Sequence, residues 1–127
     1  MEIIFSFNDI YTHWNNGLER IDDDRIIVCN SWKSLIVISI SKLEIIKEIK
    51  IDYTCYSIKS FKNKKIFLVG GHDQMIEENI YIYIKDDYEF INVYKLAYHG
   101  MITGFIELTY NFISYSIDKT IKFWELE

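Results

Sequence analysis

The chain of 127 residues is long enough to bury one hydrophobic core, and a composition of 50% hydrophobic and 17% aromatic residues argues for a single folded domain. The formal net charge of −5 disfavours a general nucleic-acid binder, because neutralising phosphates normally requires a surplus of Lys and Arg. No apolar run approaches the roughly 20 residues that span a bilayer, and the opening MEIIFSFNDIYTHW lacks the basic region of a signal peptide, so we expect no membrane attachment.

Apolar residues recur with a period of two along the chain, which favours strands over helices. Ile80, Ile82 and Ile84, for example, alternate with Tyr81 and Tyr83. Polar residues that suit turns interrupt this pattern at short intervals, as in the run of three aspartates at 22–24. We therefore predict an all-β protein, with strands near 2–7, 18–22, 25–30, 35–40, 44–51, 55–61, 65–70, 79–84, 88–97, 102–108, 111–116 and 120–126.

The predicted strands repeat along the chain at spacings of about 40 to 45 residues, which is the period of a four-stranded propeller blade. Overlaying the repeats places Ile36, Ile80 and Ile121 at one equivalent strand position. The third repeat ends after its third strand, and residues 2–7, which precede the first repeat, have the composition of the outer strand that it lacks. The overlay divides the chain into blades at about 13–51, 53–97 and 99–126.

The last 29 residues read HGMITGFIELTYNFISYSIDKTIKFWELE. The segment begins with a His, and two Ser residues lie on one side of a predicted strand. An Asp follows in a tight turn, and a Trp lies within the next predicted strand. This spacing resembles a repeat of the WD-repeat (WD40) family, whose fold is the β-propeller. The resemblance predicts about three four-stranded antiparallel blades, which form a partial WD40-like β-propeller. The first two repeats match the family by period alone, with Gly70 at the Ser position and Tyr83 at the Trp position of the second.

The resemblance to the WD-repeat family also implies a buried hydrogen-bond network in the third blade. A Trp indole only donates, a Ser hydroxyl donates and accepts, a His relays and an Asp only accepts, so the four side chains can satisfy one another. The role would be structural, and we do not expect a catalytic triad of His, Ser and Asp. By position the network would consist of His99, Ser114, Asp118 and Trp124, with Ser116 as the alternative hydroxyl.

Propellers close with typically four to eight blades, so three blades would leave apolar faces exposed to water. We therefore expect a non-catalytic scaffold for protein–protein interaction. It would complete a propeller by homo-dimerisation, with residues 2–7 of each chain completing the partner's last blade, or by docking on another propeller. Two alternatives stay open: a module that binds RNA or an acidic ligand through the basic cluster Lys59–Lys65, and an inactive fragment of a larger WD-repeat protein.

Connections at one end of the predicted blades form a candidate partner-binding face. Exposed aromatic side chains there would make good interface anchors, because they bury much area at little entropic cost. The alternative is that these rings pack between blades. The candidate residues are Trp14, Trp32, Tyr53, His72, Asp73 and Lys119.

Catalytic and metal-binding patterns are weak in this sequence. The loop at 72–79 contains one His, one Asp and two Glu but has no second His at ligand spacing, so we expect neither a metal nor another cofactor. No paired carboxylates or activated cysteine suggest an enzyme. Cys29 and Cys55 have neither CxxC spacing nor a nearby His. We expect them to be reduced thiols in a cytoplasmic protein, with the nucleus as the alternative location.

Overall fold

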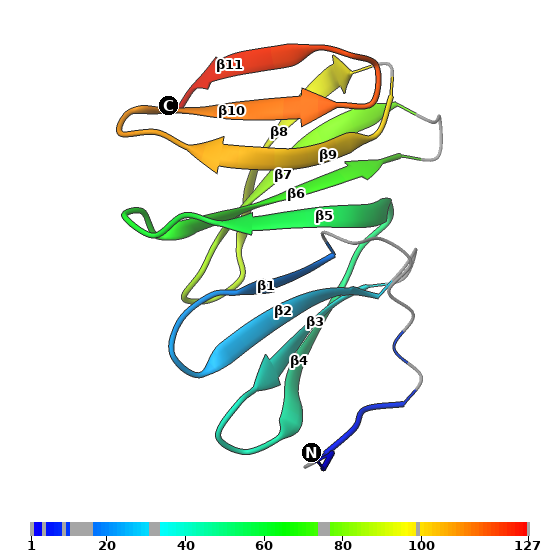
Figure 1. The fold of residues 1–127 in the computed structure, drawn as a ribbon, viewed down its shortest axis with the longest axis vertical. Helices are drawn as coiled ribbons and strands as arrows, with labels where there is room; N and C mark the ends of the chain where they lie inside the picture. The colour runs from blue at the N-terminus through cyan, green and yellow to red at the C-terminus, as the bar shows by residue number, and fades with distance from the viewer. Residues whose placement is uncertain are drawn as a thin grey trace.

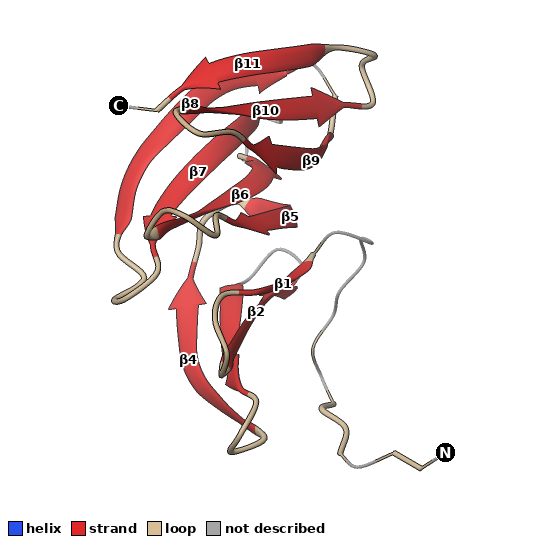
Figure 2. Ribbon diagram, turned by 60° about the vertical axis from the view of Figure 1, so that its left-hand side comes forward, coloured by secondary structure: helices blue, strands red, loops and turns tan. Residues whose placement is uncertain are grey.

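The described part of the chain folds into β-strands only. A computed structural model describes residues 2–3, 5–8, 10, 17–30, 34–73, 77–98 and 100–126, and only the backbone of 96–98. These residues form eleven strands and no helix (Figures 1 and 2). The strands make three antiparallel sheets, which confirms the predicted all-β class. A membrane-spanning helix is therefore absent from the described residues.

Each sheet is built from consecutive strands, which pair in chain order through short connections. The first sheet holds β1 (Leu18–Arg20), β2 (Arg25–Asn30), β3 (Ser34–Ser39) and β4 (Glu44–Lys50). The second holds β5 (Thr54–Ser60), β6 (Ile66–His72), β7 (Glu78–Ile84) and β8 (Phe90–Tyr98). The third holds β9 (Ile102–Glu107), β10 (Asn111–Ser116) and β11 (Ile121–Glu125).

The described residues within the predicted strand 2–7 form no strand in the single chain. Residues 2–3 and 5–8 lie in no strand, and the side chains of Ile3 and Phe5 are 86% and 53% exposed. Figure 2 shows the first residues of the chain lying apart from the three sheets. A strand requires a neighbouring strand that accepts its N–H groups, and the described residues of this segment pair with none in the single chain. Pairing of this segment with a second chain therefore stays a prediction.

The turn between β1 and β2 shows why polar runs interrupt the strands. The Asp22 carboxylate accepts hydrogen bonds from the backbone N–H groups of Asp24 and Arg25, at 3.0 and 2.8 Å. An aspartate that accepts bonds from the backbone two and three residues on closes a tight turn. The run of aspartates at 22–24 therefore reverses the chain where the sequence predicted it.

The three sheets stack face to face, so that the second sheet is buried on both sides. One core lies between the first and second sheets and includes Val37 from β3 and Phe67 from β6. Another core lies between the second and third sheets and includes Ile82 from β7 and Phe112 from β10. Burying apolar surface on both faces stabilises the stack by about 25 cal/mol for each Å² removed from water.

The predicted equivalence of Ile36, Ile80 and Ile121 is wrong at Ile36. Ile80 faces the following sheet and packs in the core between the second and third sheets. Ile36 faces away from the second sheet, where it packs with Val28, and Leu35 faces the second sheet instead. Side chains alternate along a strand, so an overlay displaced by one residue assigns the opposite face. Leu35 is the residue of the first sheet that corresponds to Ile80.

The first strands of the three sheets, β1, β5 and β9, lie next to one another (Figure 1). Two hydrogen bonds join β5 to β9: the Ser57 hydroxyl donates to the carbonyl of Ile102 at 3.0 Å, and the Ile102 N–H donates to the Tyr56 hydroxyl at 3.2 Å. The sheets are thus held together by polar contacts at their first strands as well as by apolar cores.

Candidate functional site

The third sheet presents an exposed apolar face on the side away from the second sheet. We define this outer face by two paired rows of residues, Ile106, Ile113 and Phe123 in one and Tyr115 and Ile121 in the other. The side chains of Ile121 and Phe123 are 68% and 69% exposed. In the second sheet, Ile80 and Ile82 lie on the corresponding face, and they are 0% and 3% exposed because the third sheet covers them.

The third sheet also has a free edge. It contains three strands where the first and second sheets contain four, and β11 pairs with β10 alone within the described residues. A free edge presents unpaired N–H and C=O groups to any other strand. The exposed apolar face and the free edge therefore meet along β11, which makes this end of the stack suited to binding another sheet.

Two of the four residues assigned to the buried network are joined directly. The Trp124 indole N–H donates to the Ser114 hydroxyl at 2.7 Å, and Ser114 is fully buried. The Trp124 ring also stacks on Tyr94 of the second sheet, with centroids 5.1 Å apart. This hydrogen bond therefore ties β11 to β10 at the position where the third sheet packs on the second.

The remaining members of the assigned network are not joined into one chain by the described contacts. The Asp118 carboxylate accepts hydrogen bonds from the backbone N–H and the hydroxyl of Thr120, at 2.9 and 2.5 Å, within the turn between β10 and β11. Ser116, the alternative hydroxyl, donates to the carbonyl of Gly100 at 2.9 Å. His99 lies outside the described residues, so the complete network of His, Ser, Asp and Trp stays a prediction.

The candidate partner-binding face is partly described. The end of β6, whose last residue is His72, the start of β5, which follows Tyr53, and the β10–β11 turn, which contains Lys119, lie on the same side of the stack, at the right of Figure 1. Lys119 adopts a positive φ of 72° in the β10–β11 turn. Trp14 and Trp32 lie outside the described residues.

Tyr53 does not serve as an exposed anchor in the single chain but packs between the sheets, which is the alternative that the sequence left open for these rings. Its side chain is 5% exposed and stacks on Tyr81, with ring centroids 3.6 Å apart. Its hydroxyl is hydrogen-bonded to the Tyr83 hydroxyl at 2.5 Å. The ring packs between the first and second sheets because its apolar area is better buried there than at the end of the stack.

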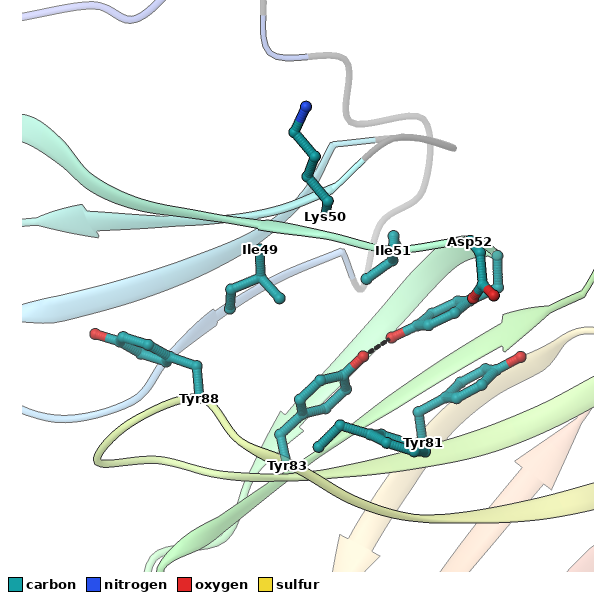
Figure 3. Close-up of a pocket in the computed structure, with 9 residues that line it drawn as sticks. Ile49, Lys50, Ile51, Asp52, Tyr81, Tyr83 and Tyr88 are labelled. Carbon is teal, nitrogen blue, oxygen red and sulfur yellow. Dashed lines mark hydrogen bonds between the residues drawn. The ribbon is translucent and has the colours of Figure 1, made fainter.

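An aromatic cleft separates the first and second sheets on the side of their last strands (Figure 3). Its volume is about 530 Å³. Ile49 and Ile51 form one wall, and Tyr81 and Tyr83 form the opposite wall. Phe90 also lines the cleft and contacts Tyr83 edge to face. The sequence did not predict this cleft, although Tyr81 and Tyr83 were expected to share one face of a strand.

Burial raises the pKa of three phenols of the cleft, those of Tyr53, Tyr81 and Tyr83. Burial raises the pKa of Tyr53 well above its ordinary value, and burial raises the pKa of Tyr83 to about 12. Burial is also the main cause of the raised pKa of Tyr81, and the negative charges of Asp73 and Asp52 raise it further. These three side chains are neutral and at most 7% exposed, and their hydroxyls are hydrogen-bonded to one another or to Asn79.

A buried carboxyl group lies at the opposite interface, between the second and third sheets. The Tyr56 hydroxyl donates a hydrogen bond to the Glu78 carboxylate, and the His72 Nδ1 lies 3.8 Å from its second oxygen. Burial raises the pKa of Glu78 from 4.5 to about 7. From the sequence, Glu78 was expected in a connection between strands, where glutamates are usually exposed. In the structure Glu78 is the first residue of β7, and its side chain is buried, with an exposure of 7%.

The basic cluster Lys59–Lys65 is partly neutralised by an acidic residue of the third sheet. The Glu107 carboxylate accepts hydrogen bonds from the backbone N–H groups of Lys62 and Asn63, at 2.7 and 3.2 Å. The Lys64 ammonium lies 3.5 Å from the same carboxylate. This arrangement uses part of the cluster for packing between sheets and leaves less positive charge for RNA or an acidic ligand.

Comparison with known proteins gives a likeness of fold. No family model matches the chain, and no curated protein matches it. The chain is similar to the crystal structure of the computationally designed Ika8 protein, with a TM-score of 0.66 and 14% sequence identity. The similarity covers 86% of this chain and 32% of the designed protein, so the chain spans about a third of that protein's length. At this identity the likeness concerns the fold alone.

Proposed function

We propose that this protein is a non-catalytic scaffold for protein–protein interaction, in which the three stacked sheets are part of a WD40-like β-propeller that another sheet completes. The observation that carries the proposal is the exposed outer face of the third sheet. Its residues occupy positions whose counterparts in the second sheet are covered by a neighbouring sheet. Exposing these apolar side chains to water is unfavourable in free energy. Binding a further sheet would remove them from water and so stabilise the protein.

Several features support the propeller as the architecture. Four-stranded antiparallel sheets, stacked with their first strands side by side, are the units from which propellers are built. The hydrogen bond from Trp124 to Ser114 joins two residues that the resemblance to the WD-repeat family assigns to one network. The likeness to a larger designed protein, over 86% of this chain, fits a chain that supplies part of a larger stack.

A second copy of the chain is the partner that the proposal favours. Residues 2–7 place Ile3, Phe5 and Phe7 at alternate positions, as a strand with one apolar face requires. Paired with the free edge of β11 in the other copy, this segment would give the third sheet its fourth strand. Two chains related by a two-fold axis would then form a closed ring of six sheets, which leaves no outer face uncovered.

The mass of the protein in solution tests this proposal. We expect light scattering after size-exclusion chromatography to give twice the 15.3 kDa chain mass. Replacing Phe123 with Glu places a charge in the outer face and should yield a monomer, while deletion of residues 2–7 should weaken the dimer. Tyr110→Glu is the matched control, because Tyr110 is 81% exposed but lies in the β9–β10 turn.

Circular dichroism must show that every variant keeps its strands, so that loss of the dimer is not loss of the fold. A folded wild-type monomer at concentrations of tens of micromolar or above would exclude the homo-dimer. Docking on another propeller protein would then remain as the second form of the scaffold. Phe123→Glu would in that case abolish co-purification of the partner from a native lysate, and the Tyr110→Glu control would retain it.

A further inference from the structure

We propose that Ile10 is an autoinhibitory plug, which covers in the single chain the surface of the first sheet on which the third sheet of a second copy docks. This rests on the scaffold function proposed above and adds two things to it, the second half of the interface and the contact that regulates assembly. The observations that carry it are the register of this surface, its contact with Ile10, and its match to the outer face of the third sheet.

The surface lies on the side of the first sheet away from the second sheet. We define this far face by two cross-strand pairs, Val28 with Ile36 and Ile26 with Ile38. The second sheet packs on the opposite side of the first, where Val37 belongs to their shared core. No described strand outside the first sheet packs on the far face, yet Val28, Ile36 and Ile38 are only 2%, 4% and 9% exposed. These apolar side chains are therefore shielded from water by something other than a sheet.

Ile10 is the described residue from outside the first sheet that packs on the far face. Its own side chain is partly buried by this contact, whereas the described residues before it, 2–3 and 5–8, are exposed. Within the described part of the chain, one side chain thus stands where the stack elsewhere places a whole sheet. A sheet of matching shape would bury more apolar area here than Ile10 does, so it can replace Ile10 with a gain in stability.

The far face has a counterpart in the second sheet that is covered by a neighbour. Ile36 directly follows Leu35, the residue that corresponds to Ile80. Ile36 therefore corresponds to the residue after Ile80, which is Tyr81. Tyr81 and its cross-strand partner Val69 are buried against the preceding sheet. The register of the stack thus assigns the far face to contact with a preceding sheet, and the first sheet has none among the described residues.

The outer face of the third sheet matches the far face in composition. At each interface within the chain, the central strands of one sheet contribute aliphatic side chains and those of the facing sheet carry aromatic rings. Val37 packs in the same core as Phe67, and likewise Ile82 packs in the same core as Phe112. The far face is aliphatic, and the outer face of the third sheet carries the exposed ring of Phe123. A second copy is therefore the occupant that fits, because each chain holds the two complementary faces at opposite ends of its stack.

The plug and the docked sheet exclude each other. Protein interiors are close-packed, so Ile10 and the third sheet of another copy cannot both lie against the same side chains. The apparent affinity of assembly is then reduced by the fraction of chains in which the far face is open. A dimer with two-fold symmetry contains two such interfaces, so this fraction enters twice. The contact of Ile10 thus holds the chain in its single form at low concentration and yields to assembly as the concentration rises.

The dissociation constant of the dimer tests the plug. We expect Ile10→Ser to lower the Kd by about tenfold or more, because the hydroxymethyl group gives up most of the apolar contact that competes with assembly. Ile91→Ser is the matched control, since it makes the same change at a side chain of β8 that is 48% exposed and lies on neither face. Its Kd should stay within about twofold of the wild type. Sedimentation velocity over a dilution series measures all three proteins.

NMR with ¹³C-labelled isoleucine methyl groups follows the contact directly. In the monomeric Phe123→Glu variant we expect a nuclear Overhauser effect between the methyl groups of Ile10 and Ile36. In wild-type dimers mixed from labelled and unlabelled chains, this signal should be lost. It should be replaced by one between the Ile36 methyl groups of one copy and the aromatic protons of the other.

The combination of results separates the plug from the scaffold function. A wild-type dimer whose Kd is unchanged by Ile10→Ser, or in which Ile10 stays on Ile36, overturns the plug and leaves the scaffold standing. Monomers of both wild type and Ile10→Ser overturn the plug together with the homo-dimer. A monomeric wild type with a dimeric Ile10→Ser supports the plug and shows that it holds the wild type apart. Circular dichroism checks the fold of each variant, and if Ile10→Ser does not fold, the NMR contacts of the wild type decide.

Discussion

The Tyr56 hydroxyl donates a hydrogen bond to the Glu78 carboxylate and links the first strand of the second sheet to its third strand. The same hydroxyl accepts the backbone N–H of Ile102, so the contact extends to the third sheet. Glu78 is 7% exposed, and burial raises its pKa from 4.5 to about 7. A carboxyl group at the junction of two sheets thus titrates in the physiological range.

Stability should decrease as the pH rises from about 4.5 to about 7, because Glu78 loses its proton more readily in the unfolded chain than in the folded one. Glu78→Gln keeps an oxygen that accepts from Tyr56 but cannot ionise. We expect this variant to be more stable than the wild type by about 1 to 2 kcal/mol above pH 7, and to show little difference near pH 4.5. Urea denaturation across this pH range measures the effect.

The exposed Glu89 provides the control for this measurement, since Glu89→Gln removes a charge from the β7–β8 connection. Its effect on the free energy of unfolding should be small at every pH. A gain in stability from Glu78→Gln that is the same at acidic and neutral pH would show that burial of the ionised carboxylate is not its cause.

The hydrogen bond from Trp124 to Ser114 should contribute measurably to the third sheet. Trp124→Phe removes the indole donor, and Ser114→Ala removes the buried acceptor. We expect each change to destabilise the protein by roughly 1 to 2 kcal/mol and their coupling energy to be about 1 kcal/mol. A double-mutant cycle from chemical denaturation gives this energy directly.

Ser116 was the alternative hydroxyl for this network, and it serves as the matched control. A cycle between Trp124→Phe and Ser116→Ala should give a coupling energy close to zero, because the Ser116 hydroxyl donates to Gly100. Strong coupling to Ser116 together with none to Ser114 would contradict the hydrogen bond seen here.

The strands could be predicted because their pattern is local. Ile80 and Ile82 face the third sheet while Tyr81 and Tyr83 face the first, as their alternation in the sequence indicated. Turns were also predictable where an acidic side chain closes them, as Asp22 does. These features depend on residues a few positions apart, so one sequence is sufficient to locate them.

The site features depend on contacts between distant segments and were not predicted. The burial of Glu78 requires Tyr56 to reach it from another strand. Likewise, the sequence left open whether Tyr53 is an exposed anchor or packs between blades. Its position depends on contacts with Tyr81 and Tyr83, which belong to β7. Residues 2–7 show the same limit, since a strand is decided by the edge with which it pairs.

Glu107 should stabilise the contact between the second and third sheets most strongly at neutral pH. Burial alone would raise its pKa, but hydrogen bonds from the backbone N–H groups of Lys62 and Asn63 hold it below the usual 4.5. A carboxylate with a lowered pKa stabilises the fold above the unfolded pKa, and this contribution is lost as the pH falls through the folded value. Acid titration followed by tryptophan fluorescence measures this loss.

Glu107→Gln is expected to destabilise the protein by about 1 kcal/mol at pH 7 and to reduce the loss of stability below pH 4.5. The exposed Glu44 of β4 gives the matched control, Glu44→Gln. Equal effects of the two substitutions at pH 7 would show that the turn between β5 and β6 does not depend on the Glu107 carboxylate.

Two glycines should respond differently to the addition of a methyl group, because different atoms stand in its way. A Cβ at Gly71 would lie 2.4 Å from the backbone oxygen of Thr54, which β5 cannot move without breaking its pairing with β6. A Cβ at Gly104 would lie 2.2 Å from the Tyr115 hydroxyl, but that side chain is 38% exposed and can rotate into solvent. We expect Gly71→Ala to destabilise the protein by about 2 kcal/mol or more, and Gly104→Ala by less than about 1 kcal/mol. Urea denaturation of the two variants in parallel tests this order. Equal decreases in the free energy of unfolding would mean that the β5 backbone moves aside as easily as the exposed Tyr115 side chain.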